Sequence, residues 1–412
     1  MTKVLFVYPN VGKTLQIPMG IAYISSYLKR SGIHTFLWDG TFQDPNTLGF
    51  SIKLLQPDIV CFSALSPDYD FVLKLAKSIR KKYDKIPFVI GGYHATFCPN
   101  EVFNTGIFDR VIVGEAEYAL MNYIEGCKEG YKIYGKLADV NEIPWPDHEM
   151  FKEHFSKKIS WSDEKYERTG VVLTSRGCPF SCTYCSCNAL KQLYGPGITR
   201  FRDIDDVINE IVYITGLYGL DNIWFTDETL TINKKRIIEL CKKYKDRVGI
   251  PFSIETRPDT VNEEVLLALK DAGCTMIRMG IESGVDRIRN GLYGRNIDRQ
   301  DIIHTFLLAK KIGLKTSSFN IAGAPTETID DIEETIYLNQ QCEVDTGKMT
   351  LFNVFPGTKM WDYCKDHGYK IKKKYPENYY EDSNFVHESL SIKQLTQMTD
   401  KFNTIINGKQ GI

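Results

Sequence analysis

The sequence carries the stretch TSRGCPFSCTYCSC at residues 174–187, directly after an apolar run. Three of its cysteines, Cys178, Cys182 and Cys185, follow the spacing C-x₃-C-x₂-C. Three thiolates from one short loop can hold three irons of a cubane cluster and leave the fourth iron open to a small molecule. Structural zinc is the competing interpretation, but it requires four protein ligands and no second cysteine pair follows. Cys187 stands too close to Cys185 to bind the same cluster.

The string RGCPFSCTYCS resembles the cluster loop of the radical S-adenosylmethionine (SAM) enzymes, and residues 1–360 are similar to their cobalamin-binding branch. The resemblance implies a [4Fe–4S] cluster, SAM on its open iron, and cobalamin. It implies that a 5′-deoxyadenosyl radical abstracts hydrogen from a small-molecule substrate, and it favours a C-methyltransferase of a biosynthetic pathway, similar to class B methyltransferases. Cyclisation or rearrangement without methyl transfer is the alternative within enzymes, and an iron–sulfur redox sensor or binding module is the alternative from another class.

The composition limits which partners and which cellular compartment are expected. The 412 residues suffice for two or three domains, and a net charge of −1 gives no reason to expect a nucleic-acid partner. No apolar stretch reaches the length of a membrane span, and the N-terminus lacks the features of a signal peptide. Eleven cysteines are too scattered for a disulfide framework. We therefore expect a cytoplasmic protein in a reducing compartment. The resemblance to radical SAM enzymes implies that an external one-electron reductant supplies the electron.

Residues 1–136 alternate near-continuous apolar runs with amphipathic helical patterns, which predicts a flavodoxin-like, doubly wound domain with five parallel strands. Ligands bind such sheets beyond the carboxyl ends of the strands. The resemblance places a Ser-x-Leu and a Gly-Gly at two of these ends, and Thr41 stands where many cobalamin-binding domains have a cobalt-ligating histidine. The residues predicted to contact cobalamin are Ser63, Leu65, Gly91, Gly92, Gly114 and Glu115. The alternative is a domain without a ligand, whose glycines serve only turns and packing.

Residues 137–168 are interpreted as a linker, because Pro144 and Pro146 flank Trp145 and no periodic pattern follows. From residue 169 to 356 six strand patterns alternate with five helical patterns, which predicts a partial (β/α)₆ barrel. The predicted strands cover residues 170–175, 221–228, 251–257, 275–283, 315–323 and 349–355. The predicted helices cover residues 204–218, 234–246, 261–272, 298–312 and 328–341.

Each barrel strand ends in polar or glycine residues, at the edge where catalytic groups gather. By resemblance, Asp227 and Glu228 contact the amino group of SAM, and Arg257 contacts its carboxylate. Glu282 and Ser283 are placed near the ribose, while Gly323 and the aromatic Tyr184 are placed near the adenine. Charged residues at strand ends can also simply cap the next helix, which is the competing interpretation of each contact. No catalytic residue is assigned.

Residues 357–412 are predicted to form a short C-terminal extension with a helix near 391–407, which packs against the open side of the barrel or acts as a substrate lid. Three further cysteines, Cys61, Cys98 and Cys127, lack the paired motifs of a second cluster, so a methylthiotransferase is disfavoured. Buried free cysteine is their expected state. His94 follows the glycine pair and is interpreted as an ordinary surface or core residue.

Overall fold

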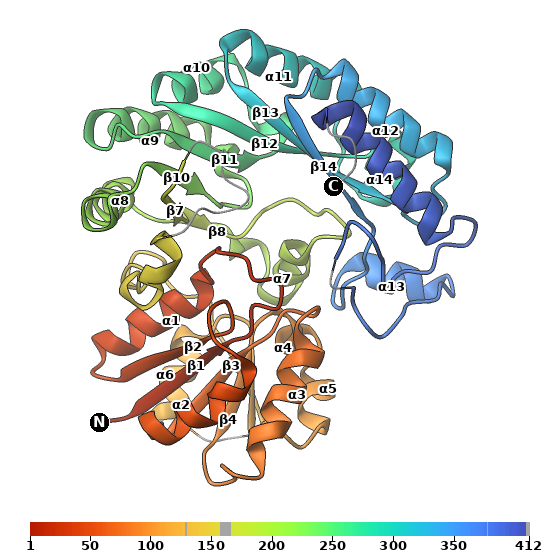
Figure 1. Ribbon diagram of the computed structural model, residues 1–412. Coiled ribbons are helices and arrows are strands. Elements are labelled where there is room, and N and C mark those ends of the chain that lie inside the picture. The colour runs from red at the N-terminus through yellow and green to blue at the C-terminus, as the bar shows by residue number, and fades with distance from the viewer. Residues whose placement is uncertain (128–129, 157–165, 377, 409–412) are drawn as a thin grey trace. The chain divides into compact units, whose positions relative to one another are not determined.

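The computed structural model describes residues 1–127, 130–156, 166–376 and 378–408. The chain divides into two compact units, Met1–Glu167 and Arg168–Ile412. Both are built on parallel sheets (Figure 1). In the described residues no helix combines the length and the apolar character needed to cross a bilayer.

The first unit contains a six-stranded parallel sheet in the order β2-β1-β3-β4-β5-β6. The first five strands have the flavodoxin-like order, but the prediction of five strands is wrong by one. The short strand Lys132–Tyr134 pairs with β5, although none of its residues is buried and they give no apolar run. The strands are β1 (Lys3–Tyr8), β2 (His34–Asp39), β3 (Ile59–Ser63), β4 (Phe88–Gly91), β5 (Arg110–Val113) and β6 (Lys132–Tyr134).

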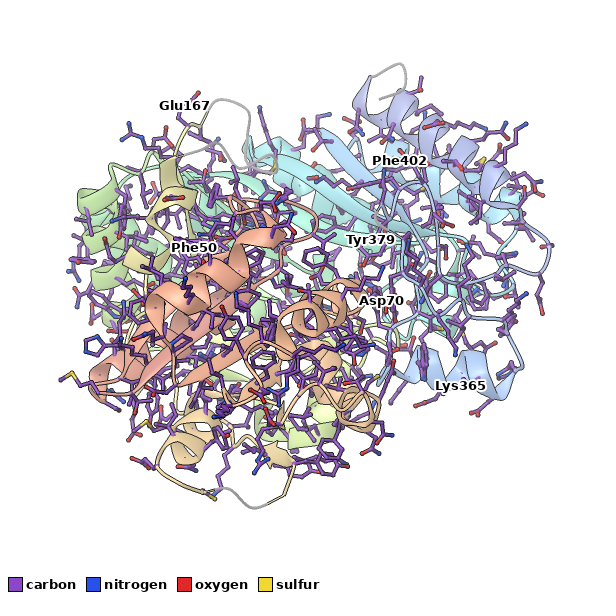
Figure 2. The ribbon with its side chains drawn as sticks, turned by 60° about the horizontal axis from the view of Figure 1, so that its bottom comes forward. Phe50, Asp70, Glu167, Lys365, Tyr379 and Phe402 are labelled. Atoms are coloured by element: carbon purple, nitrogen blue, oxygen red, sulfur yellow. The ribbon has the colours of Figure 1, made fainter. Side chains whose placement is uncertain are left out.

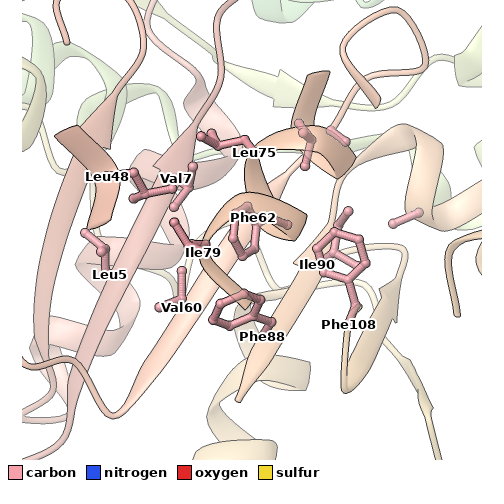
Figure 3. Close-up of a cluster of buried hydrophobic side chains, with 14 of the residues drawn as sticks. Leu5, Val7, Leu48, Val60, Phe62, Leu75, Ile79, Phe88, Ile90 and Phe108 are labelled. Atoms are coloured by element: carbon pink, nitrogen blue, oxygen red, sulfur yellow. The ribbon is translucent and has the colours of Figure 1, made fainter. Parts of the chain in front are cut away.

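The helices of this unit are α1 (Met19–Arg30), α2 (Leu48–Leu55), α3 (Tyr69–Arg80), α4 (Tyr93–Phe97), α5 (Pro99–Asn104) and α6 (Glu117–Ile124). Helices α2 and α3 bury their apolar faces against the sheet, where Phe62 packs against Phe88 and Phe108 (Figure 3). Helices α1 and α6 contact each other. A 3₁₀ helix, Glu149–Ser156, follows in the segment interpreted as a linker, and its Phe151, His154 and Phe155 are buried. Residues 157–165 of that segment lie outside the described residues.

The second unit contains six parallel strands in strict sequence order, β7-β10-β11-β12-β13-β14. In the described residues no pairing joins β7 to β14, so the barrel is partial, as predicted. The strands are β7 (Thr169–Val172), β10 (Asn222–Phe225), β11 (Phe252–Thr256), β12 (Cys274–Glu282), β13 (Lys315–Ala322) and β14 (Thr346–Leu351). A two-residue strand, β8 (Ser175–Arg176), pairs antiparallel with β9 (Arg200–Phe201).

The helices between these strands are α7 (Ser186–Tyr194), α8 (Ile204–Tyr218), α9 (Lys234–Arg247), α10 (Glu263–Asp271), α11 (Arg299–Ile312) and α12 (Ile329–Gln341). Helices α8, α10 and α12 each begin at a residue whose side chain accepts a hydrogen bond from a backbone N–H of the first turn. These capping residues are Asp203, Asn262 and Thr328. The C-terminal extension adds α13 (Lys359–Asp366) and α14 (Ile392–Asn407). Helix α14 carries Phe402, which is labelled in Figure 2. Phe402 is fully buried, and Gly347 of β14 makes room for its ring.

Candidate functional site

The cysteine loop lies between β8 and α7, at the carboxyl edge of the barrel. Gly177 starts the loop with a φ of +83°, and a Cβ there would lie 2.4 Å from the carbonyl oxygen of Ile198. Only glycine fits this close approach. The loop ends where Cys185 caps the N-terminus of α7. No disulfide is formed by Cys178, Cys182 or Cys185, and the thiols of Cys178 and Cys182 each interact electrostatically with Cys185.

The surroundings of these thiols support a bound anionic group. A hydrogen bond from the Cys187 thiol lowers the pKa of Cys185, and the backbone amides of Cys187 and Asn188 lower it further. Burial raises the pKa of Cys182, but Arg295 and Arg257 oppose this effect. Sulfur ligands enter iron–sulfur clusters as thiolates, which amide and guanidinium donors stabilise. The three-thiol donor set and its cationic setting therefore fit a [4Fe–4S] cluster.

Arg257 follows β11 and is 5% exposed. Its Nη1 donates to Cys182 Sγ at 3.3 Å, and its guanidinium lies 3.7 Å from the ring centroid of Phe180. The predicted role of Arg257 is to bind a carboxylate of SAM. In this structure, its Nε and Nη2 donate to the two oxygens of Asp259, each at 2.9 Å. One edge of the guanidinium is thus paired with Asp259, while Nη1 donates to Cys182 in the cysteine loop.

A buried pair lies beside the loop, because Arg295 donates to Glu282 Oε1 at 3.0 Å and to the Tyr184 hydroxyl at 3.1 Å. Glu282 ends β12 with a φ of +64°, at an irregularity in the pairing with β13. Gly280 accommodates this bend, since a Cβ there would lie 2.1 Å from Glu282 Oε1. Sequence reasoning placed Glu282 and Tyr184 here but missed Arg295, which comes from a loop rather than a strand end.

Two acidic residues follow β10, and their surroundings differ. Asp227 is fully buried and accepts hydrogen bonds from the Thr174 amide and hydroxyl and from the Ser175 hydroxyl. It therefore holds the chain that enters the cysteine loop. Glu228 is exposed. The pKa of Cys178 is raised mainly by burial, and the charges of Cys185 and Glu228 raise it further. Glu228 is thus the member of the pair that can reach a ligand near the thiols.

The turn after β13 is organised by a second residue that sequence reasoning missed. The buried carboxyl of Glu327 accepts the amide of Gly323 at 2.6 Å and the amide of Ala324 at 3.0 Å. Burial raises the pKa of Glu327 to about 8, although both amides oppose this. Ser283 is also buried; its hydroxyl accepts the Val285 amide at 3.3 Å and its carbonyl accepts from Arg289. Both residues shape the backbone of strand ends.

A cavity of about 150 Å³ opens beside Tyr184. Its other lining residues are Ile321, Thr350, Leu351, Phe352, Asn353, Phe355 and Tyr379. Tyr379 comes from the C-terminal extension, and Tyr375 stacks on Phe355 with ring centroids 5.5 Å apart. The extension therefore packs against the barrel and also contributes Tyr379 to the lining of this cavity.

The first unit brings the predicted strand-end residues to the carboxyl edge of its own sheet. Gly92 has a φ of +93°, and a Cβ there would lie 2.6 Å from the carbonyl oxygen of Ala64. Leu65 is half exposed, and a Cβ at Gly91 would make an ordinary van der Waals contact with the Cβ of Ile112 at 3.9 Å. The Gly114 amide donates to Thr96, and Glu115 accepts the Ala138 amide at 2.7 Å.

At the edge of β2, Thr41 accepts a hydrogen bond from Asn10. A histidine from another part of the chain lies close to this edge: His154 Nε2 is 2.7 Å from Asp39 Oδ2, and its Nδ1 is 3.0 Å from the carbonyl oxygen of Leu15. Sequence reasoning missed His154, since the segment around it has no periodic pattern. Both nitrogens of His154 are engaged within the unit.

Comparisons with known proteins agree with this division. A family model of the radical SAM superfamily matches residues 172–338, and a model of the B12 binding domain matches residues 10–124. An uncharacterized methyltransferase of Pyrococcus horikoshii is 32% identical over 401 residues, which cover 88% of this chain and 83% of that protein. The anaerobic magnesium-protoporphyrin IX monomethyl ester cyclase of Cereibacter sphaeroides is 26% identical over 88% of this chain and 64% of its own length.

Among solved structures, the radical S-adenosylmethionine methyltransferase TsrM from Kitasatospora setae, with cobalamin and a [4Fe–4S] cluster bound, has a TM-score of 0.72. The match covers 89% of this chain and 78% of that chain at 17% sequence identity. At this identity the similarity establishes a shared fold.

Proposed function

The chain belongs to the radical SAM superfamily and carries a B12-binding domain, and we propose that it is a cobalamin-dependent methyltransferase acting on a carbon of a small molecule. The observation that carries the proposal is the loop of three thiols supported by Arg257 and Arg295, in a chain that also contains the B12-binding domain. When bound, the cluster supplies the electron that cleaves SAM, and cobalamin supplies the methyl group.

Each part of the chain has a proposed role. Residues 1–136 bind cobalamin, residues 137–168 are the linker, residues 169–356 form the radical SAM barrel, and residues 357–412 are a lid over the substrate. Cys178, Cys182 and Cys185 hold the cluster. The proposed SAM contacts are Tyr184, Asp227, Glu228, Arg257, Glu282, Ser283 and Gly323. The proposed cobalamin contacts are Ser63, Leu65, Gly91, Gly92, Gly114 and Glu115.

The chain's own side chains bind and orient the cofactors. Glu228 is the exposed carboxylate near the thiols, so it suits the amino group of SAM, while Asp227 acts by holding Thr174 and Ser175. Arg295 fixes both Tyr184 and Glu282. Tyr379 and Phe355 line the cavity beside Tyr184 with aromatic surface. The electron comes from an external one-electron reductant, and a net charge of −1 favours a small-molecule substrate over a nucleic acid.

A second candidate is cyclisation or rearrangement without methyl transfer. The match to the cyclase of Cereibacter sphaeroides favours it, because that match also spans 88% of this chain. The two candidates differ in their products: methyl donation converts SAM to S-adenosylhomocysteine, whereas radical formation alone yields 5′-deoxyadenosine and methionine. An iron–sulfur redox sensor would form neither product.

The test is an anaerobic reconstitution of the full chain with iron, sulfide and hydroxocobalamin, followed by SAM and a reductant. We expect about four irons per chain, a bound cobalamin spectrum, 5′-deoxyadenosine and S-adenosylhomocysteine. The Cys178→Ala variant is the matched control and should lose the iron and the 5′-deoxyadenosine while retaining the cobalamin. Formation of 5′-deoxyadenosine without bound cobalamin would overturn the methyltransferase proposal, and absence of both products would favour the sensor.

A further inference from the structure

The first unit contains a group of possible metal donors that the proposed function does not use. A ring nitrogen of His94, the thiol of Cys98 and a carboxylate oxygen of Glu101 all lie within 4.8 Å of one another. The three residues stand at the junction of α4 and α5, and His94 and Cys98 are one helical turn apart. We propose that His94, Cys98 and Glu101 form a zinc site.

His94 has the arrangement of a metal ligand. Its side chain is buried, with 4% of the residue exposed, and its Nδ1 lies 3.1 Å from the hydroxyl of Ser66. In the part of the chain that the structure describes, its Nε2 has no hydrogen bond partner. If Nδ1–H donates to Ser66, Nε2 carries a lone pair that can bind a metal ion. In metal-bound histidines generally, the ring nitrogen that does not bind the metal donates such a hydrogen bond and orients the ring. A buried polar atom without a partner is costly, and a bound ion satisfies it.

The Tyr69 side chain supports the position of this histidine. Its ring stacks on the His94 ring with centroids 3.9 Å apart and an interplanar angle of 23°. Burial raises the pKa of Tyr69, and the charges of Glu101, Asp70 and Cys98 raise it further. Glu101 and Cys98 therefore lie near the same buried ring as His94.

The donor set selects the class of ion. A thiolate, an imidazole and a carboxylate together suit Zn²⁺, whereas Mg²⁺ and Ca²⁺ prefer oxygen ligands alone. Zinc–ligand bonds of about 2.0–2.3 Å place tetrahedral donors roughly 3.5 Å apart, and the three donors already lie within 4.8 Å of one another, so only small side-chain movements are needed. Cys98 is half-buried and Glu101 is exposed, so their side chains have room to move and the ion has a path from solvent. Water would complete the fourth position.

The site would act on the loops that carry the proposed cobalamin contacts. His94 follows Gly92 by two residues, its amide donates to the Ala64 carbonyl at 3.1 Å, and its ring contacts Ser66. A bound ion would join α4 to α5 and hold the His94 ring where it contacts Ser66 in the loop after β3. This role is independent of the thiols at 178, 182 and 185.

The test uses the full chain after anaerobic loading of the iron–sulfur cluster, so that the cluster cysteines are occupied. The protein is equilibrated with Zn²⁺, desalted and analysed for zinc and iron by mass spectrometry. We expect one zinc per chain in addition to the iron. Cys98→Ser and Glu101→Gln should each lower zinc retention at least tenfold, and Glu101 is exposed, so its variant should fold. Cys127→Ser, at an exposed cysteine of the same unit, should retain the zinc.

X-ray absorption at the zinc edge identifies the ligands. We expect one sulfur at about 2.3 Å and nitrogen or oxygen neighbours at about 2.0 Å. Three sulfurs would place the zinc in the cysteine loop and would overturn the proposal. Equal zinc retention by the wild type and by Cys98→Ser would overturn it as well, as would a wild type that retains no zinc. None of these readouts depends on catalysis, so the proposed function can fail while the zinc site stands, and the reverse.

Discussion

The guanidinium of Arg257 lies 3.3 Å from the sulfur of Cys182, and this contact makes Arg257 part of the cluster's surroundings. Replacing it in Arg257→Leu removes one N–H donor and one positive charge from a cluster ligand. Hydrogen bonds and charge near the sulfurs raise the potential of iron–sulfur clusters. We expect the midpoint potential to fall by on the order of 50 mV, measured by redox titration with electron paramagnetic resonance in the absence of SAM.

Arg287→Leu is the matched control for this change. Arg287 is half-exposed, and its hydrogen-bond and ion-pair partners among the described residues, Thr326 and Asp331, lie outside the cysteine loop. Its removal should leave the potential unchanged. Equal potentials in the two variants would show that Arg257 does not tune the cluster.

The ion pair between Arg295 and Glu282 is buried on both sides, with 5% and 10% of the side chains exposed. In Arg295→Gln the carboxylate of Glu282 stays buried without its cation. Breaking a buried pair from one side costs about 3–5 kcal/mol, whereas replacing both partners costs much less. Urea denaturation should show this loss in the free energy of unfolding of the second unit. The double variant with Glu282→Gln should recover most of it, and an additive loss in the double variant would refute the interpretation.

The strand ends of the barrel could be predicted from the sequence, and the loop residues could not. Six apolar runs separated by amphipathic helices determine the strand order, so Asp227, Arg257, Glu282 and Gly323 had to lie at one edge. Arg295 lies beyond a single helical turn, Arg287–Leu292, and no periodic pattern connects it to Glu282. Its position depends on tertiary packing that a linear pattern does not encode.

The same limit explains the other residues that sequence reasoning missed. Glu327 stands four residues after Gly323 in a turn, where its carboxyl accepts the amides of Gly323 and Ala324. The sequence alone was equally compatible with an exposed glutamate at this position. His154 reaches Asp39 across 115 residues of chain. Strand β6 has two half-buried residues and one exposed residue, so its pairing with β5, rather than its own apolar content, defines it.

A substitution at Gly92 tests the proposed cobalamin contacts. Its φ of +93° and the 2.6 Å approach of a Cβ to the Ala64 carbonyl oxygen mean that Gly92→Ala must displace the loop after β3. We expect this variant to bind hydroxocobalamin at least tenfold more weakly, measured by an absorbance titration. Gly106→Ala is the control, since Gly106 has a φ of +67° and open space around it. That variant carries only the backbone cost of a left-handed alanine, about 1–2 kcal/mol, and should keep its affinity.

The raised pKa of Glu327 predicts that the stability of the fold depends on pH. Burial raises its pKa to about 8 in the folded chain, from an ordinary value of 4.5. Between these values the folded chain holds a proton that the unfolded chain has released, so stability falls as pH rises from about 4.5 to about 8. Glu327→Gln stays neutral, and its side-chain oxygen can still accept the amides of Gly323 and Ala324.

The difference between Glu327→Gln and the wild type should therefore grow in favour of the variant between pH 5 and pH 8, measured as the shift in the midpoint of thermal unfolding at each pH. Glu333→Gln provides the control, because Glu333 is half-exposed and pairs with Lys401 at the surface. Its difference from the wild type should show no comparable slope over that range. A pH-independent difference for Glu327→Gln would mean that the carboxyl is already ionised in the folded chain. The turn at Gly323 would then be held by a carboxylate rather than by a neutral acid.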